Sequence, residues 1–266
     1  MPDNSLSYAL LLTLFAGLST GIGSFIALVA KHTNKNLLSF SLGLSAGVMI
    51  YVSFVEMFAS AQTSLVDSFG DKLGTLYCVL AFFGGIGIIM LIDFLIPDAD
   101  NPHESKLVED IISPIRDKKL HRMGLFTAFA IAIHNFPEGI ATFVTAMDDP
   151  SLGLAVAIAI AIHNIPEGIA VSVPIFYATG SRKRAFWWSF LSGLAEPIGG
   201  VLAYALLMPY ITHETLGVIL SAVAGVMVFI SVDELLPSAR RYGKHHISII
   251  GFILGMAIMA ISLVVL

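Results

Sequence analysis

Long apolar stretches separated by short polar ones dominate the pattern along this chain. A helix needs roughly 20 apolar residues to cross the hydrocarbon core of a bilayer. Eight stretches reach that length and predict membrane-spanning helices: residues 7–30, 37–61, 73–96, 123–146, 151–175, 185–208, 215–236 and 247–266. The connections are short except for residues 97–122, a predicted loop with eleven charged side chains. The pattern therefore predicts an all-α integral membrane protein in which residues 1–266 form one transmembrane domain.

The composition supports this class of protein. Of the 266 residues, 56% are hydrophobic and 12% are charged, and the mean hydropathy is +0.86. Soluble domains carry about 25% charged residues, so the partner of this surface is expected to be the lipid bilayer. The net charge of −5 gives no indication of nucleic-acid binding. The single cysteine, Cys78, excludes an internal disulfide and a structural site made of several thiolates.

The basic residues predict an orientation in the membrane. The loops after the first, third, fifth and seventh predicted spans hold thirteen of the fourteen Lys and Arg residues, and only Lys72 lies elsewhere. Loops rich in Lys and Arg stay in the cytoplasm. Eight spans with this bias place both termini outside the cytoplasm.

One motif occurs twice. Residues 130–141 read AIAIHNFPEGIA and residues 159–170 read AIAIHNIPEGIA, so eleven of the twelve positions agree. The two copies lie in the fourth and fifth predicted spans, which are consecutive and therefore antiparallel. Chance does not explain a duplication of this length and polarity within apolar helices.

A weaker repeat relates the two ends of the chain. Residues 46–61 resemble residues 224–239, and residues 16–23 can be laid over residues 192–199, so the two matches have nearly the same offset along the chain. Spans one to three and six to eight are thus predicted to be inverted repeats in a 3+2+3 arrangement, which is typical of secondary transporters. For the first and sixth spans alone, the recurrence of small residues in packed membrane helices is an equally good explanation.

The ionisable side chains inside the predicted spans are all acids or histidines. Each costs about 3 kcal/mol or more in lipid, and such groups mark functional pathways by default. They are Glu56, Asp93, His134, Glu138, His163, Glu167, Glu196, Asp233 and Glu234. Since no Lys or Arg lies deep in a span, either the carboxyl groups are protonated or a cation lies among them. Both interpretations predict a cation pathway.

The duplicated motif places four of these groups together. His134 and Glu138 lie one helical turn apart on one face, and His163 and Glu167 repeat that spacing. Two such helices facing each other would offer two imidazoles and two carboxylates, which suit zinc, iron, manganese and cobalt ions. A single histidine of this kind would serve interhelical hydrogen bonding about as often.

Other residues of the motif add to this predicted metal centre. Pro137 and Pro166 each remove a backbone hydrogen bond and kink the helix, and irregular backbone at membrane depth is tolerated where it lines a cavity. Asn135 and Asn164 add amide oxygens beside the histidines. Glu196, before a proline in the sixth span, is predicted to supply a further ligand from a similar depth.

The remaining acids are predicted to form an entrance and an exit path. Glu56 and Glu234 occupy matching positions of the weaker repeat. Inversion of that repeat places Glu56 toward the outside and Glu234, together with Asp233, toward the cytoplasm. Asp93 also lies at a cytoplasmic end. Acids satisfied by water at the membrane interface are an equally good explanation.

The paired HN-x-PEG motifs resemble those of the ZIP (Zrt-, Irt-like) metal transporters, and the compact eight-span length is most similar to the bacterial ZupT-type members. The resemblance covers essentially the whole chain. It implies uptake of zinc, and also of iron, manganese, cobalt and cadmium, into the cytoplasm across the cell inner membrane, by elevator-like alternating access. The metal would be the transported substrate, and no cofactor is implied.

The resemblance also implies a binuclear metal centre. One site would be formed by His134, Glu138, His163 and Glu167. The second would be formed by Asn135, Asn164, Glu138, Glu167 and Glu196, with the two shared glutamates bridging. Asp233, Glu234 and Asp93 match further acids of the family. The chain departs from many members by carrying Asn164 in place of an aspartate, which puts two equally tight sites in doubt.

Two other functions stay open from the sequence. An intramembrane zinc-dependent hydrolase would use the same ligands and an activated water, although one catalytic water does not require a duplicated motif. A proton-coupled carrier of organic cations would add an aromatic cage, which the motif lacks. Two GxxxG patterns, at residues 43–47 and 251–255, are more typical of close helix packing than of dimer contacts, so a homodimer is an open alternative.

Overall fold

The computed structural model describes residues 3–29, 35–95, 132, 135–210, 212–242 and 244–265. Within these ranges the regular structure is entirely helical, and seven helices are long and apolar enough to cross a bilayer. They overlap seven of the eight predicted spans. The predicted loop 97–122 and the first part of the predicted fourth span lie outside the described residues, while residues 135–148 of that span are helical. The all-α membrane class is confirmed.

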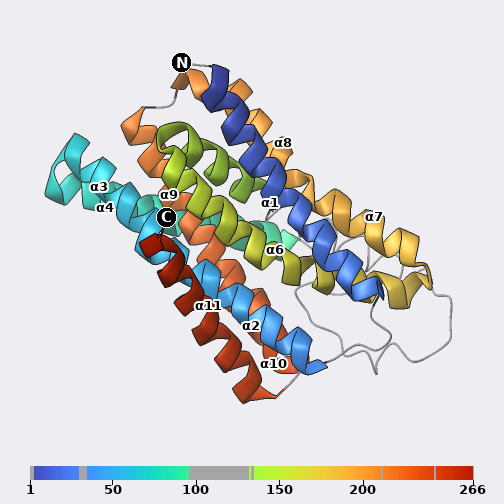
Figure 1. The fold of residues 1–266 in the computed structure, drawn as a ribbon. Helices are drawn as coiled ribbons and strands as arrows, with labels where there is room; N and C mark the ends of the chain where they lie inside the picture. The colour runs from blue at the N-terminus through green and yellow to red at the C-terminus, as the bar shows by residue number, and fades with distance from the viewer. Residues whose placement is uncertain are drawn as a thin grey trace.

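The helices follow the chain in a simple order. The first half contains α1 (Asp3–Val29), α2 (Lys35–Val52), the π-helical turn η1 (Ser53–Met57), α3 (Phe58–Phe69), α4 (Asp71–Leu95) and the helix of residues 135–148. The second half contains α6 (Pro150–Thr179), α7 (Arg182–Gly193), α8 (Ala195–Leu202), η3 (Ala203–Leu207), η4 (Met208–Tyr210), α9 (His213–Ile230), η5 (Ser231–Leu235), α10 (Leu236–Tyr242) and α11 (His245–Val265). The amino-terminal end of α1 and the carboxy-terminal end of α11 lie at the same end of the molecule (Figure 1).

The described helices pack as two groups. The site bundle contains α1, residues 135–148, α6 and the α7–α8 span, with α1 packed along α6 and α7, and residues 135–148 in contact with α6, α7 and α8. The flanking bundle contains α2, η1, α3, α4, α9, η5, α10 and α11, with α2 packed on α11 and α4 on α9. Contacts between α2 and α6 join the two bundles. Figure 1 shows α6 in the middle of the molecule.

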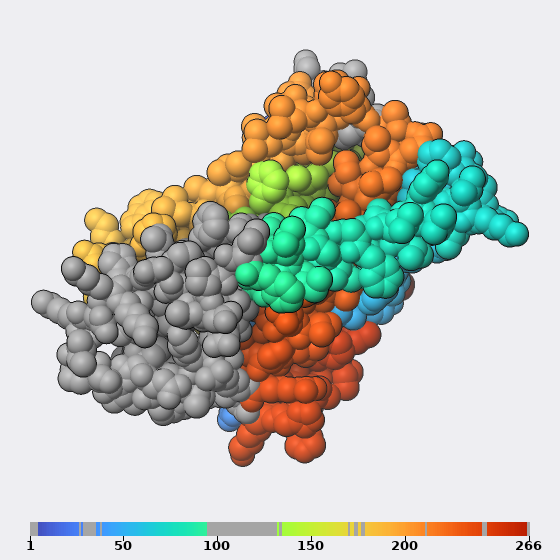
Figure 2. Space-filling model, turned by 180° about the vertical axis from the view of Figure 1, so that it is seen from behind, coloured from blue at the N-terminus to red at the C-terminus, as the bar shows by residue number. Residues whose placement is uncertain are grey.

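The outer surface of the flanking bundle is apolar. Helix α4 exposes large hydrophobic side chains along its length: Leu73, Leu76, Leu80, Phe83, Ile88, Leu91 and Phe94. A continuous row of exposed apolar side chains along a whole helix indicates a surface that is covered by lipid or by another protein. Figure 2 shows the turn between α3 and α4 projecting beyond the other helices. The exposed face of α4 is therefore suited to the bilayer.

Close packing of α2 against α11 depends on glycines. A Cβ atom at Gly43 or Gly47 would collide with a carbonyl oxygen of α11, and one at Gly251 or Gly255 would collide with a carbonyl oxygen of α2. Small residues allow membrane helices to approach this closely. The interpretation of both GxxxG patterns as packing within the chain is confirmed.

Two π-helical turns occupy matching positions of the weaker repeat. η1 begins at Ser53 and η5 begins at Ser231, and these serines are paired when residues 46–61 are laid over residues 224–239. In both turns the serine hydroxyl donates to the carbonyl oxygen four residues earlier, at 2.6 Å to Met49 and 2.7 Å to Met227. Glu56 and Glu234 lie at the same place within these turns. The local geometry supports the inverted repeat that the sequence predicts.

The third and eighth spans also make matched contacts, although their sequences show no clear similarity. A Cβ at Gly85 of α4 would collide with the carbonyl oxygen of Ala222 in α9, and one at Gly255 of α11 would collide with that of Leu44 in α2. Leu44 and Ala222 lie at equivalent positions, just before the two aligned segments that contain η1 and η5. The 3+2+3 order, which includes residues before 135, stays a prediction that these contacts support.

Candidate metal centre

The predicted ligands lie halfway along their helices. His163 and Asn164 are the fourteenth and fifteenth of the 30 residues of α6. Glu196 is the fifteenth of the 29 residues of the span Arg182–Tyr210. Since a helix rises about 1.5 Å per residue, these side chains lie near the middle of the membrane-spanning length.

His163 and Glu138 form a buried pair between two helices. Nε2 of His163 lies 3.1 Å from Oε2 of Glu138, and both side chains are fully buried. The sequence pattern suggested that His163 would share a helical face with Glu167. The structure also places the imidazole next to the carboxylate of the neighbouring helix, and Glu167 is buried as well.

Asn164 joins three helices. Its amide nitrogen donates to Glu196 of α8 and, at 3.0 Å, to the carbonyl oxygen of Ala16 in α1. Asn135, the equivalent residue in the first copy of the motif, donates at 3.3 Å to the carbonyl oxygen of Ser192 in α7. The two asparagines therefore attach the duplicated motifs to the helices on either side.

Several buried oxygens at this centre make no hydrogen bond to the part of the chain that the structure describes. They are Oε1 of Glu138, Oδ1 of Asn164 and Oε2 of Glu196. Glu138 and Glu167 both lie close enough to Glu196 to interact electrostatically with it. Buried polar atoms almost always have a partner, so acceptor oxygens gathered from three helices indicate a site for a donor or a cation.

Glycines bring α8 close to the motif. A Cβ at Gly139 would collide with the carbonyl oxygen of Glu196, and one at Gly199 would collide with that of Phe136. In the same way, a Cβ at Gly168 of α6 would collide with the carbonyl oxygen of Thr20 in α1. The PEG glycines of both motifs thus fix the distance between the acids and the adjoining spans.

The structure describes three of the four predicted ligands of the first site. His134 lies outside the described residues. Among the described residues, no three His, Cys, Asp or Glu side chains converge in a geometry ready to hold a metal ion. The contacts of the centre that the structure describes join His163 to Glu138 and Glu196 to Asn164.

One hollow lies between the bundles at the end where α6 and α9 begin. Its volume is about 580 Å³, and its lining includes the acids Asp67, Asp148 and Asp149 together with Ser60. Ser60 donates at 3.0 Å to the carboxylate of half-buried Glu56. The three aspartates lie outside the predicted spans, so the search for intramembrane charge did not identify them.

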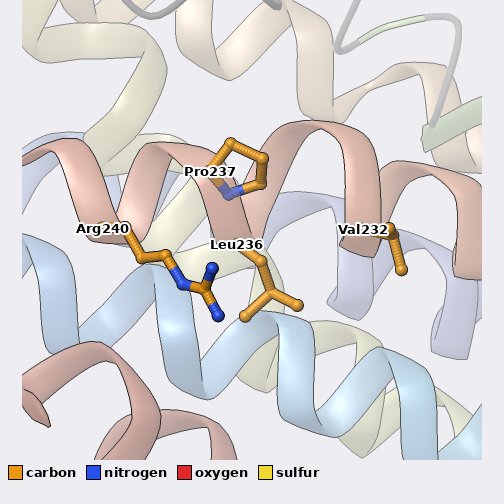
Figure 3. Close-up of a pocket in the computed structure, with 4 residues that line it drawn as sticks. All are labelled: Val232, Leu236, Pro237 and Arg240. Atoms are coloured by element: carbon orange, nitrogen blue, oxygen red, sulfur yellow. The ribbon is translucent and has the colours of Figure 1, made fainter. Parts of the chain in front are cut away.

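The other predicted path residues lie in α4 and η5, which pack within the flanking bundle. Asp93 is buried near the end of α4, Asp233 is exposed in η5, and Glu234 is half-buried beside it. A second hollow of about 590 Å³ adjoins η5 and is lined by Val232, Leu236, Pro237 and Arg240. Figure 3 shows Leu236 and Arg240 extending from the same side of the helix.

An acid-rich centre held halfway along antiparallel helices, in a multi-pass all-α membrane protein, is the arrangement of a membrane transporter. The family model described as ZIP zinc transporter matches residues 99–263. The chain belongs to this ZIP family. It is therefore a multi-pass membrane transporter and not an enzyme, which removes the hydrolase alternative.

Similar proteins match nearly the full length of the chain. A zinc transporter ZupT of Oceanobacillus iheyensis is 62% identical over 267 residues, with 99% of both chains covered. A zinc transporter ZupT of Streptococcus mutans is 61% identical over 255 residues, with 96% of both chains covered. One from Clostridium perfringens is 57% identical over 274 residues, covering 98% of this chain and 96% of the relative.

Proposed function

We propose that this protein imports zinc, and with it iron, manganese, cobalt and cadmium ions, into the cytoplasm. The observation that carries the proposal is the set of buried acceptor oxygens on Glu138, Asn164 and Glu196, next to the imidazole of His163. Carboxylate, amide and imidazole groups together suit divalent transition-metal ions. The relatives named as zinc transporters make zinc the first cargo to test.

The described ligands divide between the two sites of the proposed binuclear centre. His163, Glu138 and Glu167, together with His134, would hold one cation. Asn135, Asn164 and Glu196, with the two glutamates bridging, would hold the other. The second set consists of oxygen donors, which suit hard divalent ions such as manganese. We therefore expect this second site to discriminate less between zinc and manganese than the site that contains imidazoles.

The path runs from the hollow beside Glu56 to the acids of η5. Asp67, Asp148 and Asp149 would raise the local concentration of cations at the entrance. Asp233, Glu234 and Asp93 would receive the ion at the opposite end. The distribution of Lys and Arg supports an orientation with both termini on the periplasmic side of the cell inner membrane.

An elevator-like motion would give access to the two sides in turn. The predicted ligands in the described residues belong to the site bundle, whereas Glu56, Asp93, Asp233 and Glu234 belong to the flanking bundle. Movement of one bundle along the other, at the contact between α2 and α6, would expose the centre first to one hollow and then to the other side.

The decisive experiment measures metal uptake by purified protein in liposomes. Vesicles containing the protein should accumulate zinc faster than empty vesicles, and an excess of iron, manganese, cobalt or cadmium should reduce that uptake by competition. Absence of zinc uptake in vesicles that contain correctly folded protein would contradict the proposal. A competing organic cation that blocks uptake, with no competition from metals, would favour the organic-cation carrier.

Uptake is also expected to fall as the external pH is lowered. Imidazole and carboxylate groups must release their protons to bind metal, so protons compete with the cation at acid pH. The initial rate of zinc uptake should therefore decrease between pH 7 and about pH 5 when zinc is below saturation. A rate that rose with acidity at fixed zinc would contradict direct ligation by these groups.

A further inference from the structure

The site bundle has an internal two-fold relation that centres on two glycines. Gly17 of α1 and Gly193 of α7 are equivalent when residues 16–23 are laid over residues 192–199. A Cβ at Gly17 would collide with the carbonyl oxygen of Gly193, and a Cβ at Gly193 would collide with that of Gly17. Equivalent residues that contact each other reciprocally lie on the axis of the relation.

The same relation exchanges the two motifs and their neighbours. Asn164 donates to the carbonyl of Ala16, and Asn135 donates to the carbonyl of Ser192. The asparagines are equivalent in the duplicated motif, and their acceptors are the first residues of the two aligned segments in the first and sixth spans. Each hydrogen bond is thus the image of the other.

A second pair of contacts extends this correspondence to Glu196. Gly168 approaches the carbonyl oxygen of Thr20, and Gly139 approaches the carbonyl oxygen of Glu196. The glycines are equivalent in the duplicated motif, and the alignment of the first and sixth spans pairs Thr20 with Glu196. Thr20 is therefore the counterpart of Glu196, on the opposite side of the duplicated motif.

The hydroxyl of Thr20 is buried and makes no hydrogen bond to the described part of the chain. A threonine in a helix usually donates to a carbonyl three or four residues earlier, as Thr13 does to Leu10 at 2.9 Å. At Thr20 the carbonyl four residues earlier is that of Ala16. That oxygen already accepts from the Ser19 hydroxyl at 2.6 Å and from Asn164 at 3.0 Å.

We propose that Thr20 is a further residue of the metal centre, and that its hydroxyl oxygen helps to hold the cation on the side opposite Glu196. This inference rests on the proposed function. Glu196 interacts with Glu138, Asn164 and Glu167, and the two-fold relation predicts counterparts of these groups on the side of Thr20. The hydroxyl of Thr20 lies next to Gly193 of α7. A hydroxyl at this position is an uncharged oxygen ligand. It would contact the cation without adding a further negative charge, so the cation could still leave the site during transport.

The role of the hydroxyl distinguishes between metals. Manganese is suited by sites built from oxygen donors, whereas zinc is also bound well by imidazole and fewer ligands. Loss of one neutral oxygen contact is therefore expected to weaken manganese binding more than zinc binding. A purely structural role for Thr20 would affect the two metals equally.

The test compares Thr20→Val, Thr20→Ser and wild-type protein in liposomes, with zinc and manganese each supplied alone. Thr20→Val keeps the shape of the side chain and should raise the KM for manganese by about 3- to 10-fold, with a smaller change for zinc. Thr20→Ser keeps the hydroxyl and should stay within about 2-fold of wild type for both metals. Thr13→Val, on the same helix, removes a hydroxyl that is satisfied within the helix and should leave the ratio of the two KM values unchanged.

A second variant makes the test independent of the stability of Thr20→Val. Thr20→Glu places a carboxylate at the counterpart of Glu196, and purified protein should then retain more zinc after dialysis and transport it more slowly. Equal KM values for Thr20→Val and wild type, or unchanged zinc retention in Thr20→Glu, would overturn the role of Thr20 while leaving zinc import intact. Absence of zinc uptake by the wild-type protein would instead contradict the proposed function itself.

Discussion

Replacing Glu138 with Gln and His163 with Ala together is expected to reduce zinc uptake to the level of empty vesicles. The two side chains form the buried pair at the centre, and each is a proposed ligand. Removing a residue that only hydrogen-bonds to a metal ligand lowers metal affinity by about 10- to 100-fold. Removing two ligands should therefore lower kcat/KM by at least about 100-fold. The measurement is the initial rate of zinc uptake in proteoliposomes across a range of zinc concentrations.

A matched control removes two histidines elsewhere. His245 and His246 are exposed at the start of α11, with their rings 5.5 Å apart. Replacing both with Ala should leave uptake within about 2-fold of wild type, because exposed residues away from special features contribute little. Uptake by the Glu138→Gln, His163→Ala protein at the wild-type rate would contradict the proposed centre.

The second large effect concerns folding. Gly85→Val in α4 is expected to destabilise the protein by about 1–3 kcal/mol or more, the range for overpacking a close contact. A side chain at Gly85 would collide with the backbone of α9 at Ala222, and backbone cannot rotate away as a side chain can. The measurement is the thermal unfolding midpoint of the purified protein in mild detergent, together with the fraction that elutes as a single species.

The adjacent glycine provides the control. A Cβ at Gly84 would have no neighbour within 4 Å among the described residues, and this position is exposed. Gly84→Val should therefore unfold at nearly the wild-type temperature, since it also removes a residue of low helix propensity. Similar midpoints for Gly84→Val and Gly85→Val would show that the contact between α4 and α9 does not limit stability.

The positions of the helices could be predicted from hydropathy because lipid allows few solutions. A chain in hydrocarbon must satisfy its backbone hydrogen bonds internally, so long apolar stretches become helices. The spacing of His163, Asn164 and Glu167 likewise predicted polar groups on one helix at one depth. These features depend on residues close together in sequence.

The contacts between helices were harder to predict from sequence. The contact of His163 with Glu138 across two helices agrees with the prediction that the two motif helices face each other, but sequence spacing alone does not say which carboxylate lies nearest the imidazole. The backbone carbonyl oxygens of Ala16 and Ser192 accept hydrogen bonds from the two asparagines. Because every residue has a backbone carbonyl, the sequence does not indicate which one accepts. For the same reason, the match between the third and eighth spans is visible only where glycines meet a neighbouring backbone.

The π-helical turns η1 and η5 have a consequence for movement within the bilayer. A π-helical turn holds one more residue than an α-helical turn. Each of these two spans therefore contains one residue more than a regular α-helix with the same number of turns. Conversion of such a turn to α-helix would rotate everything beyond it by about 100° without unfolding the span. Residues 53–57 and 231–235 are therefore the positions, one in each half of the protein, at which such a rotation of the following segment would begin.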